Sequence, residues 1–364
     1  MDLDAVRAGL PVLDRLAYLN AGTNGPLPRR TVEAMGVTLA RDLEQGRSSQ
    51  GYFEAMLARR DEVRAGLARF LGAPAEAIAL TNSTTEGCNV VLNGLGIGPG
   101  DEVVTTDSEH PGLFGGLVAS GADLKIVPVR DLPVAELAGT LDAAVTERTK
   151  LIALSHVSWL TGAAMPVESL VGRGIPLLVD GAQAAGAMPV TVADLGCDFY
   201  TVSAQKWLLG PDVTGALFVR PERVEELRMA MPSYGSWEFG DDYTYDPKAG
   251  AARFDPGWIA AASGVGLLES LAFAEEAGEE RYTHAADMAA HLMHMLEGLG
   301  CEVITEPGQA TLVTWKAAGD SKEVVERLAD AGVVIRDLPG LGWLRASCGF
   351  WTNHDDLERL VGAL

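Results

Sequence analysis

The 364-residue chain lacks the features of a secreted, membrane-spanning or nucleic-acid-binding protein. No uninterrupted apolar run is long enough to cross a membrane. The first ten residues, MDLDAVRAGL, have no basic start followed by an apolar core, so we expect no secretion signal. Basic residues number 28 against 50 acidic ones, and the net charge of -22 would repel phosphate backbones. We therefore expect neither a membrane nor a nucleic acid as partner.

Cysteine is also scarce. Cys88, Cys197, Cys301 and Cys348 are widely spaced, and no CxxC pair occurs. This spacing predicts neither a disulfide framework nor a zinc site, and we expect no other metal site. Free thiols suit a reducing compartment, so a cytoplasmic protein is expected. The length favours a large domain plus a smaller one.

Short apolar runs alternate with helical patterns between about residues 77 and 220. Several runs are continuous, which is typical of strands covered on both faces. The pattern predicts an α/β fold with a mostly parallel sheet and crossover helices. The expected strands lie at 77–80, 102–105, 124–127, 151–154, 176–179, 199–202 and 215–219.

The flanking regions have other patterns. Residues 232–258 are rich in Gly, Asp, Tyr and Trp and predict an irregular segment near a site or an interface. The last third predicts a long helix followed by a compact α+β unit. Helices are expected at 1–16, 29–45, 259–298, 321–331 and 354–364, and further strands at 301–305, 311–316, 333–336 and 343–346.

Two charged residues follow predicted strands. Asp180 comes directly after the run 176–179, where a carboxylate can pair with a cationic ring nitrogen or simply cap the next turn. Lys206 follows the run 199–202 and is flanked by Trp207 and Leu208. If it is partly desolvated, its amine has a lowered pKa and can form an imine. The alternative for Lys206 is an ordinary surface lysine.

Two clusters precede these residues. Ser83 and Glu86 have the spacing of a capping box, so a helix should begin beside Thr84 and Thr85. Its first turn would be a phosphate site or a plain helix cap. His110, in the string EHPG, could lie flat on an aromatic cofactor or make only local hydrogen bonds.

Two arginines near the C-terminus complete the candidate site. Arg336 and Arg345 could each grip a substrate carboxylate bidentately, although surface arginines are common. Taken together, the order and spacing of all these clusters resemble the class V aminotransferase family of fold-type I pyridoxal phosphate (PLP) enzymes. The resemblance covers nearly the whole chain.

This resemblance implies a role for each residue. Lys206 would be the Schiff-base lysine, Asp180 the partner of the pyridine nitrogen, and Gln183 a hydrogen-bond partner of the phenolic oxygen. His110 would stack on the ring. The phosphate would be held by Thr84, Thr85 and Ser203, and the substrate carboxylate by Arg345 with Arg336.

The resemblance also implies a PLP-dependent transferase fold of type I, with a seven-stranded sheet and a smaller α+β C-terminal domain. Residues 1–45 would pack with the small domain, 46–258 would form the large PLP-binding domain, and 259–364 the small one. Members are usually homodimers with sites at the subunit boundary, which makes residues 253–258 candidates for contacts across it.

Within the family, the chain resembles most the cystine C–S lyase branch of the cysteine desulfurase-like enzymes. The shared strings are TTEGC (84–88), EHPG (109–112), LSHVSW (154–159) and KWLLGP (206–211). Desulfurases need a nucleophilic cysteine on the loop before the arginine, and residues 337–344 contain none. The resemblance therefore implies a PLP-dependent lyase that breaks a C–S bond of an amino acid without a protein thiol.

Other functions stay open. The same early chemistry serves a class V aminotransferase or an epimerase related to isopenicillin N epimerase. A persulfide-forming desulfurase would need Cys348, which follows Arg345. From another class, a catalytically silent α/β module could bind a nucleotide or a protein, but the chain has neither GxGxxG after a strand nor a P-loop.

Overall fold

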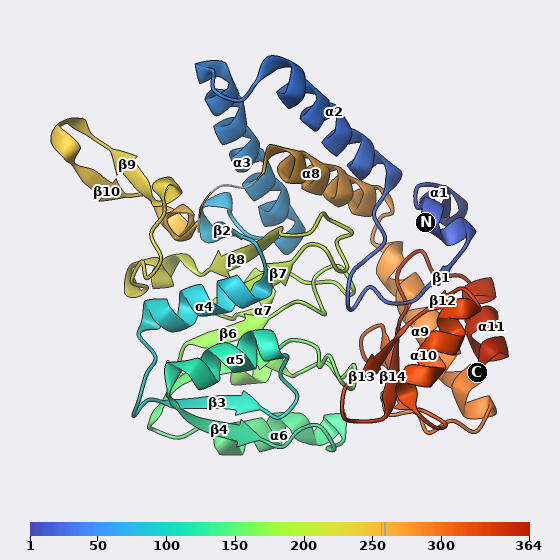
Figure 1. The fold of residues 1–364 in the computed structure, drawn as a ribbon. Helices are drawn as coiled ribbons and strands as arrows, with labels where there is room; N and C mark the ends of the chain where they lie inside the picture. Colours follow the sequence, from blue (N-terminus) through green and yellow to red (C-terminus); the bar gives the residue numbers. More distant parts are fainter. Residues whose placement is uncertain (256, 258–259) are drawn as a thin grey trace.

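The computed structural model describes residues 1–255, 257 and 260–364 (Figure 1). Its centre is a seven-stranded sheet in the order β2-β8-β7-β6-β5-β3-β4. Strand β8 runs antiparallel to β7 and β2, and the other pairs are parallel, which confirms the mostly parallel α/β fold. The strands are β2 (Ile78–Thr81), β3 (Glu102–Thr106), β4 (Asp123–Val127), β5 (Thr149–Ser155), β6 (Leu177–Asp180), β7 (Phe199–Ser203) and β8 (Gly215–Val219).

Both faces of this sheet are covered, which explains the continuous apolar runs. Neighbouring residues of one strand point to opposite faces. Ile78 and Leu80 join one buried cluster, whereas Ala79 between them joins the other. Val104 and Val103 divide in the same way. The main covering helices are α3 (Gln50–Leu71), α4 (Thr84–Leu95), α5 (Pro111–Ser120), α6 (Val134–Ala144) and the short α7 (Val192–Leu195).

The C-terminal part forms a second, smaller core beside the large sheet (Figure 1). Its three-stranded antiparallel sheet has the order β11-β14-β13. The strands are β11 (Leu312–Lys316), β13 (Arg336–Leu338) and β14 (Trp343–Ser347), with helices α9 (Glu280–Gly298), α10 (Ser321–Asp330) and α11 (His354–Ala363).

The N-terminal segment contacts this smaller core. Strand β1 (Ala17–Tyr18) pairs with β12 (Val333–Val334), and Arg7 at the end of α1 (Leu3–Ala8) binds Asp356 of α11 at 2.7 Å. Helix α2 (Arg29–Gln45) packs against α8 (Ala261–Glu276) (Figure 1). The division into three parts stays a prediction, and its boundary at residues 258 and 259 lies outside the described residues.

Several local predictions were wrong. The helix expected at 1–16 ends at Ala8, and a separate 3₁₀ turn (Pro11–Asp14) follows. The helix expected at 259–298 is two helices, α8 and α9, which are separated at Gly278, whose φ is +73°. Residues 301–305 form no strand; Val303 makes an isolated bridge to Trp315. Helix α3 was missed.

The segment expected to be irregular contains a hairpin. Strands β9 (Trp237–Phe239) and β10 (Tyr245–Pro247) pair in antiparallel fashion and project from the body of the molecule (Figure 1). Several of its aromatic side chains are exposed, with Tyr243 at 91%. Among the described helices, none combines the length and the apolar character that crossing a membrane requires.

Candidate active site

The site lies at the carboxyl ends of the central parallel strands. Ser155 at the end of β5 pairs in register with Asp180 at the end of β6, which pairs in turn with Thr201 of β7. Strand β7 ends at Ser203, and the turn that carries Lys206 follows it. Since parallel strands end at the same edge, the sheet brings Asp180, Ser203 and Lys206 together.

Asp180 and Lys206 are both buried, and each alters the charge state of the other. Burial raises the pKa of the Asp180 carboxyl, while the Lys206 charge and the backbone N–H of Ala182 oppose this rise. Burial lowers the pKa of the Lys206 amine to about 8, although the Asp180 charge works against it and the charges of Arg345 and Arg336 add to it. A lysine with this pKa is partly neutral near pH 8, as a nucleophilic amine requires.

Helix α4 begins beside this pair, as the capping-box spacing predicted. Ser83 Oγ caps the helix by accepting a hydrogen bond from Glu86 N at 3.2 Å. Thr84 N donates to Ser203 Oγ at 3.1 Å, so the helix start is joined to the end of β7. Thr85 is exposed on the same turn. The positive end of α4 and three hydroxyl groups, those of Thr84, Thr85 and Ser203, fit a phosphate group.

His110 begins helix α5 close to this turn. Its Nδ1 accepts a hydrogen bond from Gly112 N at 3.1 Å, and a Cβ at Gly112 would lie 2.4 Å from Thr85 Oγ1. The ring contacts Trp159 edge to face, with 5.2 Å between centroids. Burial and the charges of Lys206 and two arginines lower the pKa of His110 to about 4, so its ring is neutral at pH 7.

Arg336 and Arg345 are direct partners across strands β13 and β14. Arg345 is fully buried; its Nη1 donates to the carbonyl of Trp159 at 2.8 Å. Its Nε and Nη2 have no hydrogen-bond partner among the described residues. Arg336 is half-buried over the Trp159 ring, 5.7 Å from the centroid. An unpartnered buried guanidinium is costly, and a carboxylate would satisfy it.

Gln183 also lies at this site, and its amide is bound on both sides. Its Nε2 donates to the carbonyl of Gly22 at 2.9 Å, and its Oε1 accepts from Trp207 Nε1 at 3.0 Å. Since a primary amide nitrogen carries two hydrogens, Nε2 still has one donor to offer a ligand.

The turn at residues 20–28 is rich in Gly, Asn and Pro and was expected to line the pocket, but the contacts of Gly22 and Gly25 in it were not predicted. Gly22 bonds Gln183 through its carbonyl and Ser347 Oγ through its N–H, and a Cβ there would lie 2.6 Å from Arg345 Nη2. Gly25 N donates to the carbonyl of Gln205, directly before Lys206, at 2.8 Å. The composition of this turn does not reveal these partners.

Glu109 is a third residue whose role was missed. Its buried carboxylate accepts hydrogen bonds from Thr106 Oγ1 at 2.6 Å and from both the N–H and the hydroxyl of Ser155, at 2.8 and 2.6 Å. Burial raises its pKa to about 7, and the Asp180 charge adds to the rise. Glu109 thus ties the loop that carries His110 to the end of β5.

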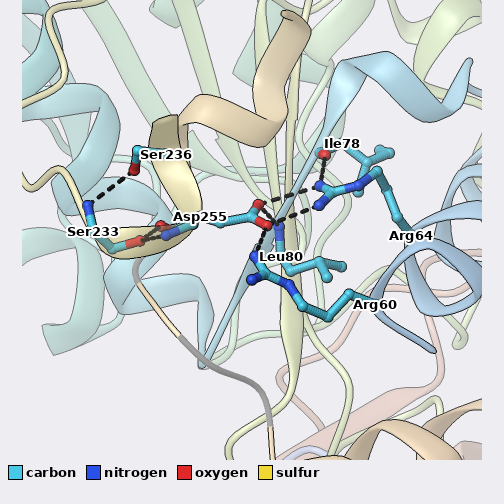
Figure 2. Close-up of polar contacts among 8 residues, drawn as sticks. Arg60, Arg64, Ile78, Leu80, Ser233, Ser236 and Asp255 are labelled. Carbon is cyan, nitrogen blue, oxygen red and sulfur yellow. Dashed lines mark hydrogen bonds and ion pairs between the residues drawn. The ribbon is translucent and has the colours of Figure 1, made fainter. Parts of the chain in front are cut away.

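Within the segment 253–258, Asp255 is held by several buried polar contacts. Its carboxylate accepts a hydrogen bond from Leu80 N at 2.9 Å and pairs with Arg64 at 2.8 Å and with Arg60 (Figure 2). Arg60 and Arg64 both come from α3. Strand β2, which carries Leu80, leads directly into the start of α4. The part of the predicted interface at Trp258 lies outside the described residues.

Cys348 follows β14 but is unsuited to act as a nucleophile. Its side chain is completely buried, and burial raises the pKa of its thiol to about 12. Nucleophilic cysteines need an exposed, acidified thiol. The cysteines at 88 and 197 are buried as well, and all four are free.

Comparisons with known proteins agree with this geometry. The aminotransferase class V family model matches residues 17–360. A probable cysteine desulfurase of Mycolicibacterium paratuberculosis is 32% identical over 89% of this chain, which spans 47% of that protein. Isopenicillin N epimerase of Streptomyces clavuligerus is 28% identical, with 100% of this chain and 98% of the epimerase covered.

Solved structures of C-DES, described as a cystine C–S lyase, have a very similar fold. One contains glycine covalently linked to its PLP cofactor; it has a TM-score of 0.92 and 26% identity, and the match covers 98% of each chain. Another holds its reaction product, cysteine persulfide, and has a TM-score of 0.91 at 26% identity over 97% of this chain and 98% of C-DES. The family match spans nearly the whole chain, and the chain therefore belongs to the aminotransferase class V family.

Proposed function

We propose that this protein is a PLP-dependent lyase that breaks a C–S bond of an amino acid, with cystine or cysteine as substrate. One observation carries the proposal: the buried amine of Lys206 lies at the strand edge with the buried carboxyl of Asp180, and its pKa is lowered to about 8. PLP, when bound, supplies an aldehyde that condenses with amines and a protonated ring that withdraws electrons from the substrate Cα.

The described residues fit this cofactor at each of its groups. Asp180 would hold a proton on the pyridine nitrogen, because a buried carboxylate favours a cationic partner. Thr84, Thr85 and Ser203 would bind the phosphate at the start of α4. His110, which is neutral, would offer a flat face to the ring. These three assignments rest on position and hydrogen-bonding chemistry.

The substrate would be oriented by the arginines. Arg345 would hold the carboxylate with its free Nε and Nη2, and Arg336 would add a second positive charge. Lys206 Nζ would then accept the Cα proton as general base. Expulsion of sulfur from Cβ needs no protein thiol, in agreement with the buried Cys348. From cystine and water, the balanced products are pyruvate, ammonia and cysteine persulfide.

The first experiment tests the cofactor. Protein incubated with PLP and then freed of unbound cofactor by gel filtration should be yellow, and borohydride should bleach it and leave the cofactor covalently attached to the peptide that contains Lys206. Lys206→Ala should abolish the attachment, whereas Lys150→Ala, at an exposed lysine, should not affect it. A colourless protein, or labelling elsewhere, would refute the proposal.

The second experiment tests the reaction. Cystine or cysteine should give pyruvate and a persulfide or sulfide without any amino acceptor. Turnover that requires an oxo-acid acceptor and releases no sulfur would instead identify an aminotransferase. Exchange of the Cα proton in heavy water without sulfur release would favour an epimerase, an alternative supported by the full-length similarity to isopenicillin N epimerase.

We also infer that two copies of this chain associate. Helix α2 exposes Val32, Leu39 and Leu43 on one face, and the neighbouring α3 exposes Phe53 and Leu57. Apolar surface of this kind, on two helices that both pack against α8, is typical of an interface. Sedimentation should give a dimer mass, and Leu39→Asp with Leu43→Asp should produce monomers. The four free cysteines support a cytoplasmic location.

A further inference from the structure

Trp207 follows Lys206 directly but points away from solvent. Its side chain is only 1% exposed and packs in an apolar cluster with Leu209 and Trp351. Within this cluster its single polar atom, Nε1, donates a hydrogen bond to Gln183 Oε1 at 3.0 Å. The residue next to the candidate Schiff-base lysine is therefore bound to a second residue of the same site.

This hydrogen bond determines which way the Gln183 amide faces. An indole N–H can only donate, so it must meet the oxygen of the amide. The carbonyl of Gly22 can only accept, so the group 2.9 Å away must be the amide nitrogen. The two contacts agree, and a flipped amide would lose both of them.

The fixed amide leaves one hydrogen of Nε2 without an acceptor among the described residues. We propose that Trp207 is a positioning residue, which holds Gln183 as a hydrogen-bond donor toward the phenolic oxygen of bound PLP. This inference rests on the proposed function. A donor at this place favours the anionic form of that oxygen and lowers its affinity for the proton it shares with the lysine nitrogen.

The test is a pH titration of the visible absorption of the bound cofactor. Trp207→Phe removes the N–H and keeps an aromatic ring in the cluster. We expect the midpoint to rise by about half to one pH unit, because one hydrogen bond to the anionic form is lost or weakened. Gln183→Ala should raise the midpoint at least as far.

The double variant separates positioning from packing. If Trp207 acts through Gln183, then Trp207→Phe should shift the midpoint no further in a Gln183→Ala protein. A purely structural role would instead lower the melting temperature in both backgrounds and leave the midpoint unchanged. An unchanged midpoint in Trp207→Phe, a fall, or an equal shift in both backgrounds would overturn the proposal.

A second measurement leaves Trp207 in place. In protein with ¹⁵N-labelled tryptophan, the indole N–H of Trp207 should exchange with deuterium faster in Gln183→Ala than in the unchanged protein. Equal exchange rates would overturn the proposed hydrogen bond even if Trp207→Phe failed to fold. Absence of any PLP binding by the unchanged protein would refute the proposed function, and the exchange experiment would still test the contact.

Discussion

Replacing Gly22 by alanine should damage the site through a single methyl group. The new Cβ would lie 2.6 Å from Arg345 Nη2 and 3.0 Å from Leu312 Cδ2, both too close for carbon. Arg345 cannot simply move aside, because it is fully buried and its Nη1 is bonded to the Trp159 carbonyl. Either the guanidinium shifts or the Gly22 backbone does, and the backbone shift strains the bonds to Gln183 and Ser347.

The crowding should change both the free energy of unfolding and the rate of turnover. Overpacking of a buried site costs about 1–3 kcal/mol of unfolding free energy. A displacement of about 1 Å in a substrate-positioning group can reduce turnover on the order of 100-fold. We therefore expect Gly22→Ala to unfold at lower urea concentration and to lower kcat/KM for cystine or cysteine on the order of 100-fold, with pyruvate release as the assay.

A matched control is Gly139→Ala in helix α6, where a Cβ meets no atom within 4 Å. Alanine is the better helix former by about 1 kcal/mol, so this variant should be slightly more stable and fully active. If Gly22→Ala retained the KM and kcat of the unchanged protein, the close approach of Gly22 to Arg345 would not matter, and the reasoning would be wrong.

Three further outcomes concern buried polar side chains. Asp255→Asn leaves two buried arginines, Arg60 and Arg64, without their shared anion and should cost roughly 3–5 kcal/mol in urea unfolding; a loss below 1 kcal/mol would contradict this. Glu109, whose pKa is raised from 4.5 to about 7, binds its proton more tightly when folded, so its contribution to stability falls as pH rises through this range. The unfolding free energy of Glu109→Gln, relative to that of the unchanged protein, should therefore be higher at pH 8 than at pH 5, by up to roughly 3 kcal/mol. The same relative value at both pH values would refute this reasoning. Cys348→Ala should keep full pyruvate release, whereas loss of activity in a folded variant would restore the desulfurase alternative.

The large sheet and its two charged residues were predictable because each depends on local pattern. A strand buried on both faces needs a continuous apolar run, and a charge directly after such a run lies at the edge of the sheet. Asp180 and Lys206 both follow this rule. The roles assigned to the site residues came from the family resemblance, and they stay predictions.

Helix α3 and the break between α8 and α9 were missed for physical reasons. Helix α3 buries Arg60 and Arg64 for their ion pairs with Asp255, so its buried face is not a clean apolar stripe. Gly278 is flanked by good helix formers, Glu, Ala and Arg at residues 275–281, and a single glycine did not outweigh them. Contacts such as Trp207 with Gln183 join residues 24 positions apart and leave no periodic signal.

The charges of the site explain how an acidic protein can favour the carboxylate of an amino acid. The chain carries a net charge of -22, yet Lys206, Arg336 and Arg345 converge near His110, where their charges all lower its pKa. Asp180 opposes them, and Glu109, with a pKa of about 7, is only partly ionised at neutral pH. Buried cations act over a longer range than screened surface carboxylates. An amino acid carboxylate is thus favoured inside the site, while polyanions too large to enter meet the acidic surface.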